Sequence, residues 1–523
     1  MSNQNPEQSS SSRVIDGFIV LFLAVASIGI FTSGLFPYAA LLGDFPGTNI
    51  TLALIVALVS GILLVYIYSS IGAFSPHHGA DYVLMSRVLT GSLGFAASFT
   101  MMVGVVMLVS GFTGTLATVA FPIISKTAGI TANASFSVLE GLNTPTGVII
   151  VGSILIVLAF IVSIFPVQIA RNILRLGFFL TLLSWAGLLF QLAAPIQSFA
   201  DGWNTYMGFG AYDRQLFIAR QLGLTTGPFP NAFLTLGLII AVILFVGIVI
   251  PVWMAKEVKK PQQDLLFGNL GAVLIASALF IMTSLFLLRL VPVNWLAAQS
   301  YIYLRTGEGS EAVYPWLFFY ANILRPNPTL AYLFLLGWLI STFNLLVVTI
   351  MAGSRMLLAW SKDKILPVSL SFKHPSLDTP VVAVLWMSLL LELGVMLFAL
   401  THTYSLESIR PFFFVIASGQ IISAVALAVY PLKNVDAFQK ASGPAGWRIG
   451  NIPLVSLAGL IWVAYGVYLL NYLALSPRGF ELRPFGWIMG TFAVGFALYW
   501  FRKNQLMKQG INLEMIVSHP PEE

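Results

Sequence analysis

Residues 245–261 read Phe-Val-Gly-Ile-Val-Ile-Pro-Val-Trp-Met-Ala-Lys-Glu-Val-Lys-Lys-Pro, an apolar segment that contains Gly247 and Pro251 and ends in a charged cluster. Glycine permits non-helical backbone, and proline removes an amide donor and clashes with the preceding turn. At membrane depth an unpaired backbone group is costly, so a break is tolerated only where the freed groups face protein, a water-filled cavity or a substrate. The stretch therefore predicts a discontinuous transmembrane helix with a binding site at its break.

Composition places the chain among all-α membrane proteins. Of its 523 residues 58% are hydrophobic and only 9% are charged, whereas about 25% are charged in a soluble domain. Apolar segments of transmembrane length recur from end to end, and we expect about twelve spans. The chain has no cysteine, which excludes disulfides and Cys-based metal sites. We also find no metal-spaced His cluster, phosphate loop or nucleophile-and-base set, so we expect no enzyme activity and no metal centre.

The distribution of charge predicts the topology. An even number of spans places both termini on one side of the membrane. Roughly seventeen of the 26 Lys and Arg residues lie on that side, which predicts cytoplasmic N- and C-termini in a multi-pass protein of the cell membrane. No loop gathers the cations into a long basic run, so nucleic acid is not an expected partner. The expected partners are the lipid bilayer and a small-molecule substrate, and no protein partner is evident.

The first span resembles the sixth. Residues 30–37 read Ile-Phe-Thr-Ser-Gly-Leu-Phe-Pro, so here too a glycine (Gly34) precedes a proline (Pro37) inside an apolar run. Thr32 and Ser33 add hydroxyl groups beside the glycine. Gly and Pro are also common in membrane helices as packing and kink residues. Two such breaks in corresponding positions of a repeat nevertheless favour a binding site between them.

Four stretches carry a resemblance to a known family. They are Thr32-Ser33-Gly34-Leu35-Phe36, Pro76-His77-His78-Gly79-Ala80-Asp81-Tyr82, Glu257-Val258-Lys259-Lys260-Pro261, and Ser354-Arg355 followed by Ser361-Lys362-Asp363-Lys364-Ile365-Leu366-Pro367 and Thr379-Pro380. In this order and spacing they resemble the amino acid–polyamine–organocation superfamily of permeases. Thr32 replaces the first glycine of the family's Gly-Ser-Gly-Ile-Phe, and Ala80 replaces the second glycine of its Pro-x-x-Gly-Gly-x-Tyr.

The resemblance implies a 5+5 inverted repeat with discontinuous helices 1 and 6 and two peripheral C-terminal helices. The corresponding regions are a tail (1–14), a first repeat (15–197), a second repeat (230–431), the peripheral helices (452–502) and a second tail (503–523). In that family the first break holds the carboxylate of an amino acid and the sixth holds its amino group. The implied binding residues are therefore Thr32, Ser33 and Gly34 at the first break and Phe245, Val246 and Gly247 at the sixth. Ile243 and Leu244 stand where an aromatic gate is expected, and Phe245 is the nearest ring.

Two coupling ions stay open from the sequence. Ser341 and Thr342 in the eighth span, with Asn344 close by, are a hydroxyl pair that could hold Na⁺ together with carbonyls of the first break. The alternative is that these hydroxyls bond back to their own helix. Some proton-coupled relatives place a lysine in the fifth span, where this chain has Ser184, so coupling to H⁺ is the other candidate. We expect no further cofactor.

Charged residues near the predicted cytoplasmic ends could form an inner gate. The candidates are Asp81, Arg87, Lys256, Glu257, Arg355 and Asp363. The alternative is ordinary anchoring by local ion pairs. His77 and His78 are adjacent in a loop, and we expect them to be solvated. Glu392 is the only carboxylate expected near mid-bilayer, and a structural role is as good an interpretation as a functional one.

These features predict a secondary active transporter that moves amino acids or closely related small amines by alternating access. An exchanger or a polyamine carrier of the same fold is the nearest alternative, so symport and antiport both stay open. A channel or a transport-inactive sensor would be a different class. No ring of like charges or filter sequence supports a channel.

Overall fold

The computed structural model describes residues 13–34, 41–122, 124–125, 141–225, 227, 231–306, 316–401, 406–474 and 482–519. Eleven helices in these ranges are long and apolar enough to cross a membrane, and the shorter apolar helix α1 belongs to a twelfth span. The spans are α1 (Gly17–Ile28) with α2 (Ile30–Gly34), α3 (Ile50–Phe74), α5 (Gly91–Thr115) with the π-helical η3 (Leu116–Ala120), α7 (Pro145–Ile164), α8 (Val167–Ala193), α11 (Ala232–Phe245) with η5 (Val246–Ile248) and α12 (Val249–Val252), α13 (Pro261–Leu290), α16 (Pro328–Lys362), α17 (Val381–Leu400), α18 (Leu406–Lys433), α20 (Leu454–Ala474) and α21 (Leu482–Met507). The predicted all-α membrane protein of about twelve spans is confirmed.

Local sequence explains where many of the spans begin. The side chains of Asn49, Thr90, Thr144 and Asn327 each accept a hydrogen bond from a backbone N–H in the first turn of the helix that follows. Such caps pair amide groups that have no partner inside the helix. α7, α13 and α16 also carry proline in the first turn, where its missing N–H costs nothing.

The contacts between spans come in matching pairs. The first span (α1) packs on the seventh (α13), and the second (α3) packs on the sixth (α11). The third (α5) packs on the tenth (α18), and the eighth (α16) packs on the fifth (α8). Spans five places apart in the chain make equivalent contacts. The contact of spans 1 and 7 corresponds to that of spans 6 and 2, and the contact of spans 3 and 10 corresponds to that of spans 8 and 5. This is the pattern expected of a 5+5 repeat. The exact boundaries of the repeats stay a prediction.

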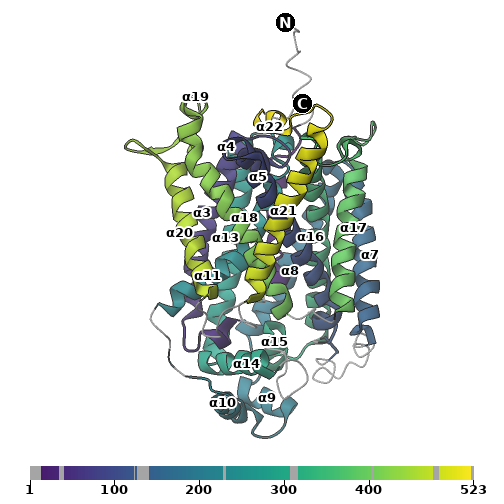
Figure 1. The fold of residues 1–523 in the computed structure, drawn as a ribbon. Helices are drawn as coiled ribbons and strands as arrows, with labels where there is room; N and C mark the ends of the chain where they lie inside the picture. Colours follow the sequence, from purple (N-terminus) through teal and green to yellow (C-terminus); the bar gives the residue numbers. More distant parts are fainter. Residues whose placement is uncertain are drawn as a thin grey trace.

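The described ends of the chain, Arg13 and His519, lie on one side of the bundle, which we call the terminal side (Figure 1). Short elements cover this side between the spans. They are α4 (Ala80–Val88), η6 (Ala255–Glu257), η7 (Val368–Ser371), α19 (Val435–Gln439), η8 (Pro444–Gly446), a hairpin of β1 (Arg448–Ile449) and β2 (Ile452–Pro453), and α22 (Leu513–Ser518).

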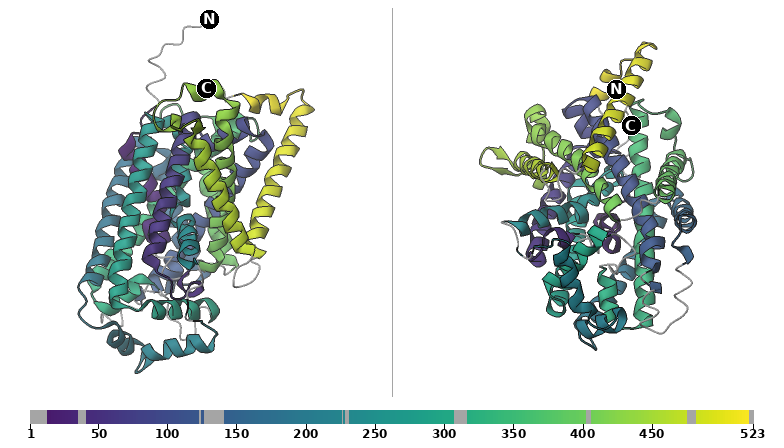
Figure 2. Two further views of the ribbon diagram at one scale, coloured as in Figure 1. Left: turned by 90° about the vertical axis from the view of Figure 1, so that its left-hand side faces the viewer. Right: turned by 60° about the horizontal axis from the view of Figure 1, so that its bottom comes forward.

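A helical cap closes the opposite end of the bundle (Figures 1 and 2). It consists of α9 (Phe199–Met207), α10 (Ala211–Gln221), α14 (Val293–Thr306) and α15 (Leu317–Leu324), with η2 (Leu42–Asp44) from the end of the first span packed on α14. Aromatic rings form its core: Trp295 stacks on Tyr212 at 5.3 Å and meets Trp203 edge-on at 4.7 Å. These four helices belong to the two long connections between spans, residues 197–230 and 292–328, in the part that the structure describes.

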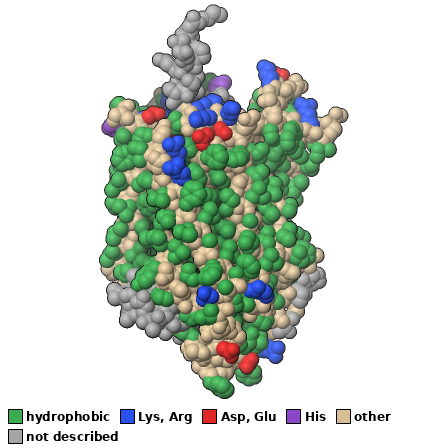
Figure 3. Space-filling model, turned by 180° about the vertical axis from the view of Figure 1, so that it is seen from behind, with side chains coloured by type: hydrophobic (Ala, Val, Ile, Leu, Met, Phe, Trp, Pro, Cys, Tyr) green, Lys and Arg blue, Asp and Glu red, His purple; other side chains and the backbone are tan. Residues whose placement is uncertain are grey.

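The outer surface matches the bilayer. On the face shown in Figure 3, hydrophobic side chains cover the middle of the molecule, and charged side chains gather toward its two ends. Lipid-facing helices such as α7 and α17 present many exposed large apolar side chains, for example Ile154, Val157 and Leu393. In water such a surface would aggregate, whereas in a membrane it is solvated by acyl chains.

Candidate substrate site between the two helix breaks

The first break is centred on Gly29. This residue ends α1 in the left-handed conformation, with φ 60° and ψ 63°, and α2 starts directly after it. Its N–H donates to the carbonyls of Val25 and Ala26. Only glycine adopts this backbone without strain. The sequence pattern predicted the break at Gly34, and nothing in that pattern distinguished Gly29. Leu35, Phe36 and Pro37, which belong to that prediction, lie outside the described residues.

The hydroxyl groups of the first break satisfy its own freed carbonyls. Thr32 Oγ1 donates to the carbonyl of Gly29 at 3.0 Å, and Ser33 Oγ donates to the same carbonyl at 2.9 Å and to that of Ile28. The Ser33 N–H also donates to the Gly29 carbonyl at 2.9 Å. Thr32 and Ser33 are buried. In the conformation described here, both hydroxyls are therefore engaged with the end of α1, although their lone pairs can still accept.

The sixth span is interrupted at the expected residues. α11 ends at Phe245, η5 follows as a tight 3₁₀ turn, and α12 continues with Pro251 inside it. Gly247 lies directly against the first break: a Cβ atom there would come within 2.2 Å of the Ser27 carbonyl oxygen. The freed carbonyl of Val246 accepts a hydrogen bond of 3.1 Å from Nε2 of Gln420 in α18. The two breaks, as the structure has them, are thus in direct contact.

A small cavity lies where the breaks meet. Its volume is about 20 Å³, enough for roughly one water molecule. Ser27, Ile28 and Ser33 line it from the first break, and Val246 and Gly247 line it from the sixth. The other lining residues are apolar side chains of the third, sixth, eighth and tenth spans: Val105, Leu108, Val109, Phe112, Ile243, Leu244, Ile250, Leu345, Phe413 and Ile416.

The predicted binding residues divide into those at the cavity and those turned away from it. Gly34 packs against the ring of Phe280, since an added Cβ would lie 2.2 Å from Cε1 of that ring. The ring of Phe245 lies against Gly61 of α3 rather than in the cavity, since a Cβ on Gly61 would be 2.7 Å from its Cδ2. The hydroxyl of Thr32 points at its own helix. Ser33, Val246 and Gly247 remain at the cavity.

Sequence reasoning missed the rings that do face the cavity. Phe112 of α5 and Phe413 of α18 lie edge to face, with centroids 6.0 Å apart. Phenylalanine is common in membrane helices, so its type carries no signal. Gln420, by contrast, is a buried amide in a membrane-spanning helix, and that polarity was a usable signal.

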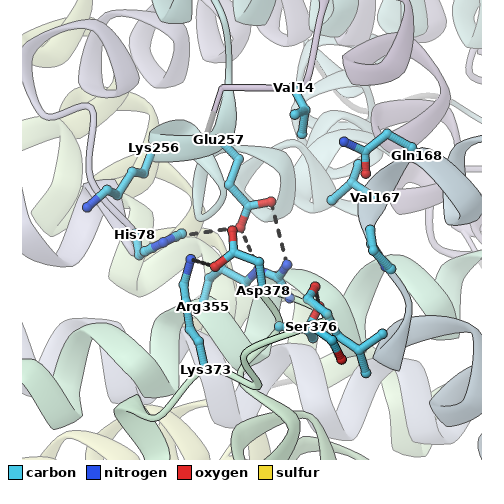
Figure 4. Close-up of a pocket in the computed structure, with 13 residues that line it drawn as sticks. Val14, His78, Val167, Gln168, Lys256, Glu257, Arg355, Lys373, Ser376 and Asp378 are labelled. Atoms are coloured by element: carbon cyan, nitrogen blue, oxygen red, sulfur yellow. Dashed lines mark hydrogen bonds and ion pairs between the residues drawn. The ribbon is translucent and has the colours of Figure 1, made fainter. Parts of the chain in front are cut away.

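On the terminal side, the candidate gate residues form two separate ion pairs. Arg355 Nε lies 2.8 Å from Glu257 Oε1, and this pair faces a polar cavity of about 290 Å³ (Figure 4). Arg87 forms a bidentate ion pair with Asp363: Nη1 lies 2.7 Å from Oδ2, and Nη2 lies 2.8 Å from Oδ1. Such planar two-point pairing is the strong form of an ion pair. Lys256 lines the polar cavity without joining either pair.

The surroundings of Asp81 and His78 differ from those expected, since Asp81 was a candidate gate residue and His78 was expected to be solvated. Asp81 is fully buried and pairs with no gate cation; it accepts from Trp253 Nε1 at 3.0 Å instead. Burial raises the pKa of Asp81 to about 6. His78, which we expected to be solvated, is 5% exposed, and burial and then Arg355 lower its pKa well below the ordinary value. It is therefore neutral, and its 3.9 Å approach to Glu257 is a polar contact rather than an ion pair.

A backbone connection joins the two broken spans near this gate. The N–H groups of Val14 and Ile15 both donate to the Glu257 carbonyl at 2.9 Å, and Lys259 N–H donates to the Ile15 carbonyl at 2.8 Å. The segment that enters the first span is thus attached to the segment that leaves the sixth. The terminal-side halves of the two broken helices are held together both here and at Gly247.

The candidate ion ligands lie outside the cavity lining. Thr342 Oγ1 donates to the carbonyl of Trp338 in its own helix at 2.9 Å, as the alternative interpretation had it. Ser184 Oγ donates to the carbonyls of Leu180 and Leu333, which ties the fifth span to the eighth. Neither observation tests the coupling ion. In the part of the chain that the structure describes, no group of three His, Asp or Glu residues could hold a metal ion.

Glu392 has a local partner. Its Oε1 accepts a 2.5 Å hydrogen bond from Ser153 Oγ in α7. Both residues belong to spans at the edge of the bundle, away from the breaks. The structure therefore places Glu392 in the packing of the ninth span on the fourth.

Comparison with known families agrees with this geometry. A family model described as amino acid permease matches residues 15–498. Comparison with the curated proteins finds no match. The family match covers nearly the whole chain, including both breaks, the gate residues and the first peripheral helix. The chain belongs to the amino acid permease family and is a membrane transporter of amino acids or amines.

Proposed function

We propose that the chain is a secondary active transporter that binds an amino acid between the two breaks and moves it by alternating access. The observation that carries this proposal is the cavity enclosed by both breaks, with the backbones of Ser27 and Gly247 in contact. Half-helix ends present partial charges that suit the two charged groups of an amino acid. A cavity of about 20 Å³ holds no amino acid, so this conformation is closed and substrate entry requires the breaks to separate.

The lining of the cavity favours an amino acid with an apolar side chain. The described lining residues include Val105, Val109, Ile243 and two phenylalanines, and none of them is charged. A polyamine carries several positive charges, and burying them without carboxylates is strongly unfavourable. An amino acid carries only one carboxylate and one ammonium group, and backbone N–H and C=O groups can bind them. The polyamine carrier is thus the weaker alternative.

Each end of the bundle has its own closing contacts. On the terminal side these are the Glu257–Arg355 and Arg87–Asp363 pairs and the backbone connection at Ile15. On the cap side, Asp44 lies 4.0 Å from Arg410 of α18, and Gly43 N–H donates to Ser300 Oγ in α14 at 3.0 Å. Alternating access would release one set of contacts at a time.

The direct test is counterflow with the purified protein in liposomes. Unlabelled alanine, leucine or phenylalanine trapped inside should accelerate uptake of the same labelled amino acid. A carrier shows this acceleration because its site returns loaded, whereas a channel does not. Absence of acceleration with every amino acid, together with linear flux, would favour the channel. A protein that binds an amino acid without moving it would be the transport-inactive sensor.

The coupling ion and the orientation belong to the same proposal. We propose Na⁺, with Ser341 and Thr342 as ligands in an open conformation, and H⁺ as the alternative. Replacing Na⁺ with choline should then lower transport, and unchanged transport would end the Na⁺ proposal. We also propose cytoplasmic termini. Ser518→Cys, the only cysteine in that variant, should resist an impermeant thiol reagent in intact cells, and labelling from outside would reverse the orientation.

A further inference from the structure

A deep apolar groove opens toward the bilayer on the terminal-side half of the bundle. It has a volume of about 590 Å³ and lies between the third, eighth, ninth and twelfth spans. α17 and α21 both pack on α5, and α16 lies between these two helices in the view of Figure 1. The groove is separate from the cavity between the breaks, because the two share no lining residue.

The groove has a buried floor and an open mouth. Phe95, Met102 and Trp360 on its floor are at most 3% exposed, whereas Leu393 and Leu498 at its mouth are 63% and 44% exposed. Along α17 the lining runs from residue 386 to residue 397, a length of about 16 Å at 1.5 Å per residue. A void of this size would forfeit many dispersion contacts. The solute available at this depth is a lipid acyl chain.

Two cations stand at the terminal-side end of the groove. Lys364 lies two residues before the lining residue Leu366, and Arg502 lies one helical turn after the lining residue Leu498. Arg502 Nε donates to the Lys364 carbonyl at 2.8 Å, so the two residues are adjacent. No described carboxylate forms an ion pair with either one. Nearby Asp363 and Glu514 are engaged elsewhere, by Arg87 and Lys503.

We propose that this groove binds one anionic glycerophospholipid, with an acyl chain on the Phe95–Trp360 floor and the phosphate at Lys364 and Arg502. An apolar groove alone would accept any lipid. The adjacent cations select negative charge, because unpaired Lys and Arg at a membrane surface attract anionic headgroups. The lipid would contact α16 and α17 at the end that carries the gate pair of Asp363, and so reach the transport machinery from outside the substrate pathway.

The test is native mass spectrometry of the detergent-purified protein titrated with phosphatidylglycerol or phosphatidylcholine of identical acyl chains. We expect the first bound phosphatidylglycerol at a concentration at least about tenfold lower than the first phosphatidylcholine, a difference of about 1.4 kcal/mol. Equal half-saturation by the two lipids would overturn the proposal. Inorganic phosphate as competitor should leave lipid binding unchanged; displacement by phosphate would show an anion site without an acyl-chain site.

Matched variants separate the groove from the rest of the surface. Leu390→Trp places a large side chain in the groove and should abolish the first lipid adduct. Leu389→Trp, its lipid-facing neighbour outside the lining, should bind as the unmodified protein does. If both bind alike, the groove is not the site. Dimer masses that disappear only in Leu390→Trp, with lipid binding intact, would instead assign the groove to a second copy of the chain.

The headgroup contacts have their own pair of variants. Lys364→Gln and Arg502→Gln should each reduce the preference for phosphatidylglycerol while binding of phosphatidylcholine persists. Lys440→Gln removes an exposed cation on the same side of the bundle and should leave the preference unchanged. A preference that survives the double variant Lys364→Gln/Arg502→Gln would overturn the role of the two cations, even where the acyl chain still binds.

Discussion

The two helix breaks solve the same problem in different ways. The first break pairs its freed carbonyls with hydroxyls from its own next turn, Thr32 and Ser33. The sixth break has no hydroxyl of its own and relies on Gln420 from a distant span. The first break is therefore encoded locally, whereas the sixth depends on the assembled bundle. A break that depends on its neighbours can change its state when those neighbours move, which suits the part of a transporter that must respond to substrate.

The largest expected effect separates the glycines of the two breaks. Gly247→Ala would bring a Cβ within 2.2 Å of the Ser27 backbone, whereas the nearest described atoms to a Cβ in Gly34→Ala, also from 2.2 Å, belong to the ring of Phe280. A ring can rotate away, whereas a backbone can move only with its helix. We expect Gly247→Ala to lower substrate affinity by about a hundredfold or more, equivalent to about 2.7 kcal/mol, and Gly34→Ala to lower it much less. Binding would be measured by titration calorimetry.

Gly490→Ala serves as the control for both glycine variants. Gly490 lies in α21 with no other atom within 4 Å of an added Cβ. The Gly490→Ala variant should bind substrate normally and be slightly more stable than the unmodified protein, because alanine has a higher helix propensity than glycine. Equal losses in Gly247→Ala and Gly34→Ala would break the distinction between the two breaks.

The second effect concerns the gate that follows the sixth break. Arg355→Ala would leave the Glu257 carboxylate, which is 13% exposed, without its partner. Removing one member of a buried pair costs about 3–5 kcal/mol. We expect a large fall in the thermal unfolding midpoint and faster thiol labelling of cysteines placed in the substrate cavity from the terminal side. Arg355→Met/Glu257→Gln removes both charges and should recover stability but not gating. Failure of the double variant to recover would show that Arg355 acts through packing.

The third effect is a pH dependence of stability that arises from Asp81, which accepts a hydrogen bond from Trp253 just after the sixth break. Burial raises its pKa from 3.8 to about 6. Between about pH 4 and 6 the folded protein keeps this proton while the unfolded chain loses it, so stability falls as pH rises through this window. Two pKa units correspond to roughly 3 kcal/mol. Asp81→Asn should abolish this fall in unfolding curves recorded at pH 4, 5, 6 and 7. An identical slope in the variant would assign it to other groups.

The smallest effects test the comparison itself. Gln420→Leu leaves the Val246 carbonyl without its partner, at a cost of about 1–3 kcal/mol. Ser33→Ala removes one of several donors at the first break and should cost about 1 kcal/mol. Substrate should restore less stability to Gln420→Leu than to Ser33→Ala, because only the sixth break then lacks its support. Matching responses of the two variants to substrate in thermal unfolding would contradict the difference between the breaks.

The sequence predicted the elements better than their contacts. The number of spans and the break at Gly247 follow from hydropathy and from Gly and Pro, which act locally. Gly29 was missed because a glycine in a membrane helix is usually a packing residue, and only its left-handed φ distinguishes it. Phe112 and Phe413 were missed because two spans far apart in the sequence bring them together. The gate role of the charged residues stays a prediction, and the way these residues pair, which leaves Asp81 to Trp253, depends on the fold.

The measurement that tests the central claim most directly uses the absence of cysteine in the chain. Val105→Cys places a thiol in the cavity between the breaks, and Phe209→Cys places one on the fully exposed cap. Both would be labelled with a small methanethiosulfonate in liposomes, with and without an amino acid that shows counterflow. The substrate should slow labelling at position 105 by about tenfold and leave position 209 unchanged. Equal labelling at position 105 with and without that amino acid would place the substrate elsewhere.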